Sequence, residues 1–186
     1  FRLGDFYEMF FEDAVTASRV LGITLTGRES GKGNRVPMCG VPYHAAQEYI
    51  AKLIRAGHKV AVCDQVEDPS LAKGLVKREV TRVVTPGTAL EEELLGAGSN
   101  NYLAAIHRAG GLYGLSCLDL STGEFLATEL SCEADLLNEI ARLSPSEFLL
   151  PRALAEDAAF MKALRRVSDK LVNPCDDWLF EREGAF

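Results

Sequence analysis

The chain has 186 residues, a length that suits one large domain or two small ones. Hydrophobic residues make up 47% of it and charged residues 25%, which is average for soluble globular proteins and excludes disordered, collagen-like and low-complexity chains. No apolar run approaches the roughly 18 residues of a membrane-spanning helix, so we expect no membrane partner and a cytoplasmic location.

The formal net charge of -7 is unevenly distributed. Residues 1–94 carry 12 Lys and Arg against 13 Asp and Glu, a net of -1, while residues 95–186 carry 8 against 14, a net of -6. This balance argues against nucleic-acid coating by bulk attraction but leaves room for a basic face in the first half. The five cysteines form no C-x-x-C pair, as expected of buried or half-buried reduced thiols in an intracellular protein. Because the chain starts at Phe1 rather than Met, we expect a piece of a longer protein.

In chain order, residues 1–9 predict a strand and residues 10–21 a helix. Phe10 and Phe11 open the helix's apolar face, which recurs at the spacing of a buried side and stops at Gly22. The elements expected next are a strand over 23–29, a glycine-rich basic loop over 27–35, an irregular segment over 36–44 forced by Pro37 and Pro42, a helix over 45–56, and strands over 59–66 and 77–86. Strands interleaved with helices predict an α/β domain.

After an acidic, then Gly- and Asn-rich stretch over 91–101, expected to be a linker, the pattern changes. The expected elements are strands over 102–108, 112–120 and 123–130, a helix over 132–143, a strand over 148–150, a helix over 153–166 and a strand over 170–172. Three antiparallel strands followed by αβαβ is the order of an RNase H-like fold.

Two features that would indicate an enzyme are incomplete. Only three residues separate Gly27 from Gly31 where a phosphate-binding P-loop needs four, and Gly33 replaces the Ser or Thr that would hold magnesium. Two-metal nucleases need several converging carboxylates, yet the opening strand over 102–108 has none and Asp119 has no partner by spacing. We expect no catalytic site, no metal and no cofactor in this chain.

The segment Gly4-Asp5-Phe6-Tyr7-Glu8 carries more information. On a strand, Phe6 and Glu8 project to one side about 6.6 Å apart while Tyr7 points the other way, into the core. An exposed ring can enter a base stack as a wedge, and a neighbouring carboxylate can accept a hydrogen bond from the displaced base. The alternative is an ordinary half-buried strand with one more core Phe and a solvated Glu.

The sequence here resembles the bacterial MutS family of DNA mismatch-recognition ATPases. The resemblance is carried, in family order and spacing, by FRLGDFYEMFFEDA, LGITLTGR, PMCGVPYHA, YIAKLIRAGHKVAVCDQVEDP, KGLVKREVTRVVTPGT and NNYLAAI, which cover essentially all of residues 1–105, and it continues more weakly to about 180. It implies a mixed-sheet mismatch-binding domain over 1–94 and an RNase H-like connector domain over 95–186. It also implies that ATP and magnesium are bound elsewhere, in the full-length parent.

By position, the resemblance makes Phe6 the wedge that stacks on the mispaired base from the minor groove and Glu8 the carboxylate that hydrogen-bonds that base. Leu3 takes the place of a bulky apolar residue near the same step, and Arg82 matches a basic residue close to the DNA. Further candidates for phosphate contacts are the basic residues near the wedge: Arg2, Arg28, Lys32, Arg35, Lys77 and Arg78.

The function implied is binding of mismatches or small insertion/deletion loops in duplex DNA for mismatch repair, within a homodimeric or larger parent that works with a MutL-type partner. One alternative is a scaffold whose acidic connector docks that partner while the first domain binds DNA weakly. Another is a relative that recognises branched DNA, against which the retained Phe6 and Glu8 argue.

Overall fold

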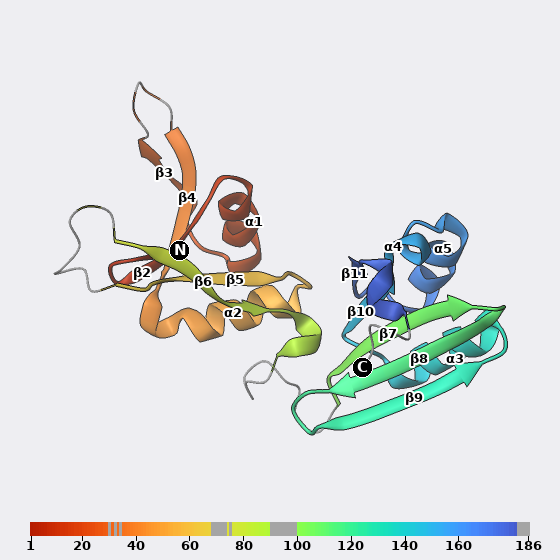
Figure 1. The fold of residues 1–186 in the computed structure, drawn as a ribbon. Helices are drawn as coiled ribbons and strands as arrows, with labels where there is room; N and C mark the ends of the chain where they lie inside the picture. The colour runs from red at the N-terminus through yellow and green to blue at the C-terminus, as the bar shows by residue number, and fades with distance from the viewer. Residues whose placement is uncertain are drawn as a thin grey trace. The chain divides into compact units, whose positions relative to one another are not determined.

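The computed structural model describes residues 1–29, 31, 33, 35–67, 74, 76–89 and 100–181. It divides into two compact units, Phe1–Thr85 and Pro86–Phe186 (Figure 1). The expected domain boundary after residue 94 and most of the expected linker fall outside the described residues. Within the described ranges, no helix is long and apolar enough to cross a membrane.

The first unit is built on a four-stranded antiparallel sheet in the order β1-β2-β4-β3. Its strands are β1 (Arg2–Leu3), β2 (Phe6–Phe10), β3 (Thr26–Glu29) and β4 (Arg35–Pro42). The remaining elements of the first unit are helix α1 (Phe11–Leu21), the 3-10 turn η1 (Tyr43–Ala45), helix α2 (Ala46–Arg55) and the antiparallel strand pair β5 (Val60–Gln65) and β6 (Arg78–Val84).

The single strand expected over 1–9 is wrong: the segment is a tight hairpin. Gly4 and Asp5 form a two-residue turn between β1 and β2, and Leu3 pairs with Phe6 directly across it. Gly4 has a φ of 60°, a conformation that costs glycine little and that two-residue hairpin turns require. The hairpin places Phe6 at the very start of β2.

The irregular segment expected over 36–44 is also wrong, because β4 is a regular eight-residue strand. Pro37 lies beyond Met38, the last β4 residue that pairs with β2, and Pro42 is the final residue of the strand. Each proline therefore pairs with a neighbouring strand on one side only, so the N–H that it lacks is not needed for a second ladder.

The core of the first unit lies between α1, α2 and one face of this sheet (Figure 1). Gly22 ends α1 in a left-handed conformation with φ of 66°, as the sequence predicts. The expectation that Phe11 belongs to the buried face is wrong, since its side chain is 63% exposed. The chain passes from β2 into α1 without a loop, and Phe11 takes a φ of 53° to make the turn outside the helical register.

The second unit is a five-stranded sheet in the order β11-β10-β7-β8-β9. Its strands are β7 (Tyr102–Ala109), β8 (Leu112–Asp119), β9 (Glu124–Leu130), β10 (Glu147–Pro151) and β11 (Leu171–Cys175). The first three are antiparallel, and β10 runs parallel to both β7 and β11. This strand order is the one expected of an RNase H-like fold, and it confirms the predicted α/β class.

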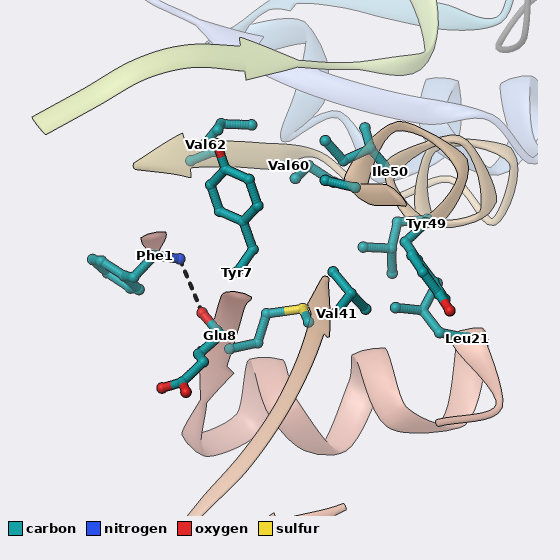
Figure 2. A pocket seen from close by; sticks show the side chains of 13 residues that line it. Phe1, Tyr7, Glu8, Leu21, Val41, Tyr49, Ile50, Val60 and Val62 are labelled. Carbon is teal, nitrogen blue, oxygen red and sulfur yellow. Dashed lines mark hydrogen bonds between the residues drawn. The ribbon is translucent and has the colours of Figure 1, made fainter. Parts of the chain in front are cut away.

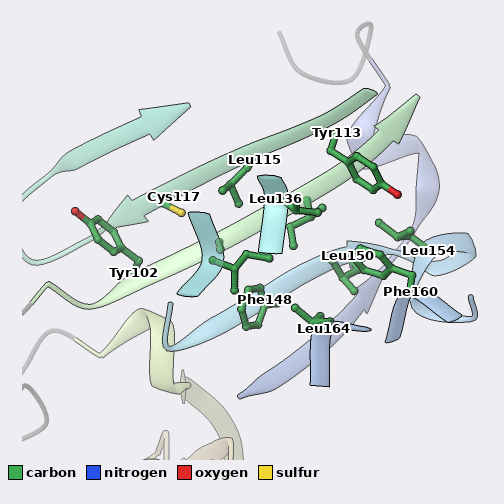
Figure 3. Packing of buried hydrophobic residues seen from close by; sticks show 13 residues of the cluster. Tyr102, Tyr113, Leu115, Cys117, Leu136, Phe148, Leu150, Leu154, Phe160 and Leu164 are labelled. Carbon is green, nitrogen blue, oxygen red and sulfur yellow. The ribbon is translucent and has the colours of Figure 1, made fainter. Parts of the chain in front are cut away.

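Helices α3 (Glu133–Leu143), α4 (Arg152–Ala155) and α5 (Ala158–Val167) complete the second unit, together with the 3-10 turns η2 (Pro86–Thr88) and η3 (Asp177–Phe180). Buried side chains from the strands pack against buried side chains from the helices in one continuous core, which includes Phe148 and Phe160 (Figure 3). The single helix expected over 153–166 is split, because Asp157 accepts hydrogen bonds from the N–H groups of Ala159 and Phe160 and begins a new helix.

All five cysteines are free thiols. Cys39, Cys63 and Cys117 are buried, whereas Cys132 is exposed, contrary to the expectation of buried or half-buried thiols alone. Burial raises the pKa of the Cys117 thiol to about 11, so this thiol stays protonated and unreactive at neutral pH.

Asp119, the carboxylate considered for nuclease chemistry, instead anchors the end of β8. It is 1% exposed and accepts hydrogen bonds from the backbone N–H of Asn101 at 3.0 Å and from the N–H and hydroxyl of Ser121 at 2.9 and 2.7 Å. Burial alone would raise the pKa of Asp119, but these hydrogen bonds outweigh it and the pKa lies below its ordinary value of 3.8. The carboxylate is therefore charged and structurally committed at neutral pH.

Replacing this carboxylate should destabilise the second unit. We expect Asp119→Asn to lower the free energy of unfolding by about 2 kcal/mol at pH 7. The amide keeps only one acceptor oxygen, and its NH2 group would face a backbone N–H that the carboxylate now accepts from. Since the folded-state pKa is lowered, the difference from wild type should be full above about pH 4 and shrink as the pH falls further. Urea unfolding followed by Trp178 fluorescence measures it, with exposed Asp169→Asn as control; equal midpoints for Asp119→Asn and wild type at pH 7 would contradict the role.

Candidate nucleic-acid interface

The β1–β2 hairpin presents Phe6 to solvent. The ring is 48% exposed although it belongs to the first residue of a sheet strand. The backbone N–H of Tyr43 donates to the carbonyl oxygen of Asp5 at 2.9 Å, which ties the hairpin turn to the end of β4. The strand that carries the exposed ring is paired with β1 on one side and β4 on the other, so the ring is held in place before any partner binds.

Phe6 and Glu8 lie on the same face of the sheet, on either side of Gly40. Glu8 pairs with Gly40 across β2 and β4. A Cβ atom at Gly40 would lie 3.4 Å from Cγ of Glu8 and 3.7 Å from Cδ1 of Phe6, so both side chains border the space that this glycine leaves. The Phe6 ring and the Glu8 side chain thus border the same open space over Gly40.

Tyr7 points to the opposite face and packs against the core, as predicted. Figure 2 shows Tyr7 directed toward Val62 while Glu8 points away from the apolar cavity behind β2. The hydroxyl of Tyr7 donates to Oδ1 of Asp64, and Oδ2 of Asp64 accepts from Thr81 at 2.8 Å. Burial and this hydrogen bond raise the pKa of Tyr7, and the hydrogen bond from Tyr7 lowers the pKa of Asp64. Strand β2 is therefore anchored from behind.

The Glu8 carboxylate is poorly compensated. Its side chain is 18% exposed, and Nη1 of Arg28 lies 3.5 Å from Oε2 as its ion-pair partner. Oε2 is buried and accepts no hydrogen bond within the described part of the chain. A desolvated carboxylate oxygen without a donor is costly, and a donor from outside would relieve that cost.

The structure brings together some of the predicted site residues and separates others. Leu3, Phe6, Glu8 and Arg28 share one face, because residues paired directly across strands point the same way: Leu3 pairs with Phe6, and Glu8 and Arg28 pair with even-numbered residues of β4. Arg35, itself odd-numbered in β4, belongs to the other face, and its side chain lies across Gly27.

Two other predicted arginines have partners in the first unit. Arg78 donates from Nε to the carbonyl oxygen of Arg2 at 2.8 Å and from Nη1 to that of Val76 at 2.8 Å, so its guanidinium helps to hold β1. Arg82 is exposed on β6 and donates from Nη2 to Oε1 of Gln47 at 3.1 Å. Lys32 lies outside the described residues.

Sequence reasoning missed two features around the β1–β2 hairpin, of which only the first lies beside Phe6. Gly40 supplies the open space between ring and carboxylate, and the guanidinium of Arg2 lies 3.6 Å from the centre of the Tyr43 ring, a cation–π contact. Both depend on how β4 pairs with β2. Within one sequence, the Gly-Val-Pro-Tyr run offered no signal of that register.

Among the described residues, no group of three or more His, Cys, Asp or Glu side chains could hold a metal ion. The arrangement around Phe6 offers an apolar ring, a carboxylate acceptor and the guanidinium of Arg28. Such a set suits contact with a base and its neighbouring phosphates.

Comparisons with known proteins bear on this site. Residues 1–93 match the family model described as MutS domain I, and residues 101–185 match that of MutS domain II. The DNA mismatch repair protein MutS of Acetivibrio thermocellus is 51% identical over 186 residues, covering 98% of this chain and 21% of that protein. The MutS of Methanothrix thermoacetophila is 59% identical over 152 residues, covering 81% of this chain and 18% of that protein. The chain thus spans about a fifth of the length of these relatives.

The anchor behind β2 can be tested by stability alone. Tyr7→Phe removes the hydroxyl that satisfies Asp64, and we expect it to lower the free energy of unfolding of the first unit by about 1 kcal/mol. Tyr43→Phe is the matched control, because it keeps the ring against Arg2 and removes an exposed hydroxyl. Urea denaturation followed by circular dichroism measures both; an unchanged Tyr7→Phe would show that the hydroxyl does not secure the strand.

Proposed function

The chain belongs to the MutS family, and we propose that its first unit recognises mispaired or unpaired bases in duplex DNA as the sensing module of a mismatch-repair protein. The observation that carries the proposal is the exposed Phe6 ring at the tip of a braced hairpin, beside the incompletely satisfied Glu8 carboxylate. The names of the relatives indicate mismatch repair as the biological setting, and the geometry of the first unit supports the roles proposed for Phe6 and Glu8.

In this proposal Phe6 enters the base stack from the minor groove as a wedge. Unstacking a base step costs a few kcal/mol, and least where pairing is already defective. Kinking the duplex costs about 1–6 kcal/mol, and a mismatch lowers that cost. The protein can therefore detect an error by testing which step opens and bends cheaply, without reading sequence. Leu3, paired with Phe6 across the hairpin, would lie against the same step.

Glu8 adds a check at the level of the base. A carboxylate repels duplex DNA unless an unpaired donor compensates it, so it penalises correctly paired DNA. The N3–H of an unpaired thymine is such a donor, and Oε2 of Glu8 accepts no hydrogen bond from the residues that the structure describes. A purine N7 is only an acceptor, so contact with it requires the protonated carboxyl group.

Phosphate contacts would supply affinity without sequence preference. Arg28 shares the wedge face and Arg82 lies exposed on β6, which makes them the best-placed candidates. Arg35 belongs to the opposite face of the sheet and Arg78 is engaged with backbone carbonyls. We therefore rank these two lower for direct contact with the DNA step that the wedge enters.

The rest of the proposal concerns the longer proteins that this chain resembles. We propose that ATP and magnesium act in domains outside the segments matched here, and that the whole protein is a homodimer or higher oligomer that works with a MutL-type partner. The alternative, a scaffold whose second unit docks that partner, predicts that the chain alone passes through a heparin or DNA resin unretained at low salt.

Removing the wedge should abolish selectivity while keeping general DNA binding. In a full-length MutS protein carrying this chain in its matching segment, we expect Phe6→Ala to lower the ratio of matched to G·T dissociation constants about tenfold or more, because the unstacking contact is lost. Phe11→Ala, which removes another exposed ring of the first unit, should leave the ratio unchanged. Equal discrimination by wild type and Phe6→Ala, measured by fluorescence anisotropy at one salt concentration, would refute the wedge.

The need for a donor at a purine N7 gives a separate test. For a mispair whose contacted base presents N7, we expect Glu8→Gln to bind at least as tightly as wild type, because the glutamine amide carries a permanent N–H donor. Fluorescence anisotropy at one fixed pH and salt concentration measures both affinities. Much weaker binding by Glu8→Gln to such a mispair would show that position 8 does not donate to N7.

A further inference from the structure

Arg28 and Glu8 form an ion pair on the wedge face of the first unit, and this pair has a consequence for selectivity. We infer that Arg28 is a specificity-determining residue that restrains Glu8: it offsets the carboxylate's charge and so makes correctly paired DNA more tolerable to the protein. The inference rests on the proposed function of Phe6 and Glu8. It assigns Arg28 a role that a simple phosphate contact would not have.

The geometry makes the two charges direct neighbours. Nη1 of Arg28 lies 3.5 Å from Oε2 of Glu8, and Oε2 has no hydrogen-bond donor in the described part of the chain. The Glu8 side chain is 18% exposed and the Arg28 side chain 61% exposed. Arg28 is therefore the outer partner, able to reach solvent and DNA, while Glu8 is held closer to the sheet.

The position of Arg28 follows from strand pairing. Arg28 pairs with Val36 of β4, and Glu8 pairs with Gly40 of the same strand, so both lie on the face that carries Phe6. Arg35 precedes Val36 by one residue and so points to the other face. The chain thus offers two arginines of equal charge, close in the sheet, of which Arg28 is paired with Glu8.

The two kinds of DNA respond differently to this pair. A matched duplex offers Glu8 no free donor, so the positive charge of Arg28 is what offsets repulsion between the carboxylate and the phosphates. In a G·T mispair the thymine N3–H is paired with guanine O6, but once the wedge has displaced the thymine this N3–H can donate to the carboxylate instead, which makes Arg28 less needed. Arg28 should therefore favour binding to matched DNA more than to mismatched DNA, and so lower selectivity while raising affinity.

The test compares Arg28→Gln, Arg35→Gln, Glu8→Gln and the double variant Arg28→Gln/Glu8→Gln in the same full-length context. Each is titrated with a matched duplex and with its G·T counterpart at one fixed salt concentration. We expect Arg28→Gln to raise the ratio of matched to G·T dissociation constants about two- to five-fold. Arg35→Gln should leave that ratio unchanged, and Arg28→Gln should not alter it in the Glu8→Gln background.

Two results would overturn the inference while the proposed function stands: an unchanged ratio with equal loss of affinity for both duplexes, as expected of a phosphate contact, or a lowered ratio. A ratio that rises equally with and without Glu8 would also overturn it, because the effect would not pass through the carboxylate. If Glu8→Gln itself left the ratio at the wild-type value, the proposed role of Glu8 would fail and the inference with it.

Discussion

The alternation of side chains along β2 is the constraint on which the proposed site depends. Tyr7 turns inward and its hydroxyl donates to Asp64, while Phe6 and Glu8 turn outward on either side of Gly40. Because the side-chain period of a strand is two residues, a one-residue slip would bury the ring and the carboxylate and expose the tyrosine. The same strand register therefore places the Tyr7 anchor behind the sheet and the Phe6 and Glu8 side chains in front of it.

This arrangement explains how a small unit could apply force to a base pair. A wedge on a mobile loop would bend away from the duplex, whereas Phe6 begins a strand paired on both sides, with β1 and with β4. The turn before it is tied to η1 through the Tyr43 N–H. Because the hairpin is rigid, inserting the ring deforms the DNA rather than the protein. The free-energy cost of opening the DNA step therefore decides whether the protein binds.

The sequence predicted the α/β class, the helix end at Gly22, and the opposite orientation of Tyr7 relative to Phe6 and Glu8. These depend on local periodicity and on glycine. It did not predict the hairpin at Gly4 or the regular strand through Pro37, because an isolated proline indicates a break unless its neighbours in the sheet are known. Nor did it separate Arg28 from Arg35, which requires the register of β3 on β4. The sequence alone did not reveal which strands pair or in what register, and that pairing determines which side chains share the face with Phe6.

In the proposed mechanism, Phe6 unstacks the mispaired step. The most direct measurement is the fluorescence of 2-aminopurine placed beside a G·T mispair, since this base brightens when it loses its stacking neighbours. We expect a rise on saturation with the wild-type protein, no rise with the matched duplex, and no rise with Phe6→Ala even at concentrations that saturate the DNA. An equal rise with wild type and Phe6→Ala would show that the duplex opens without the ring, and Phe6 would then not be the wedge.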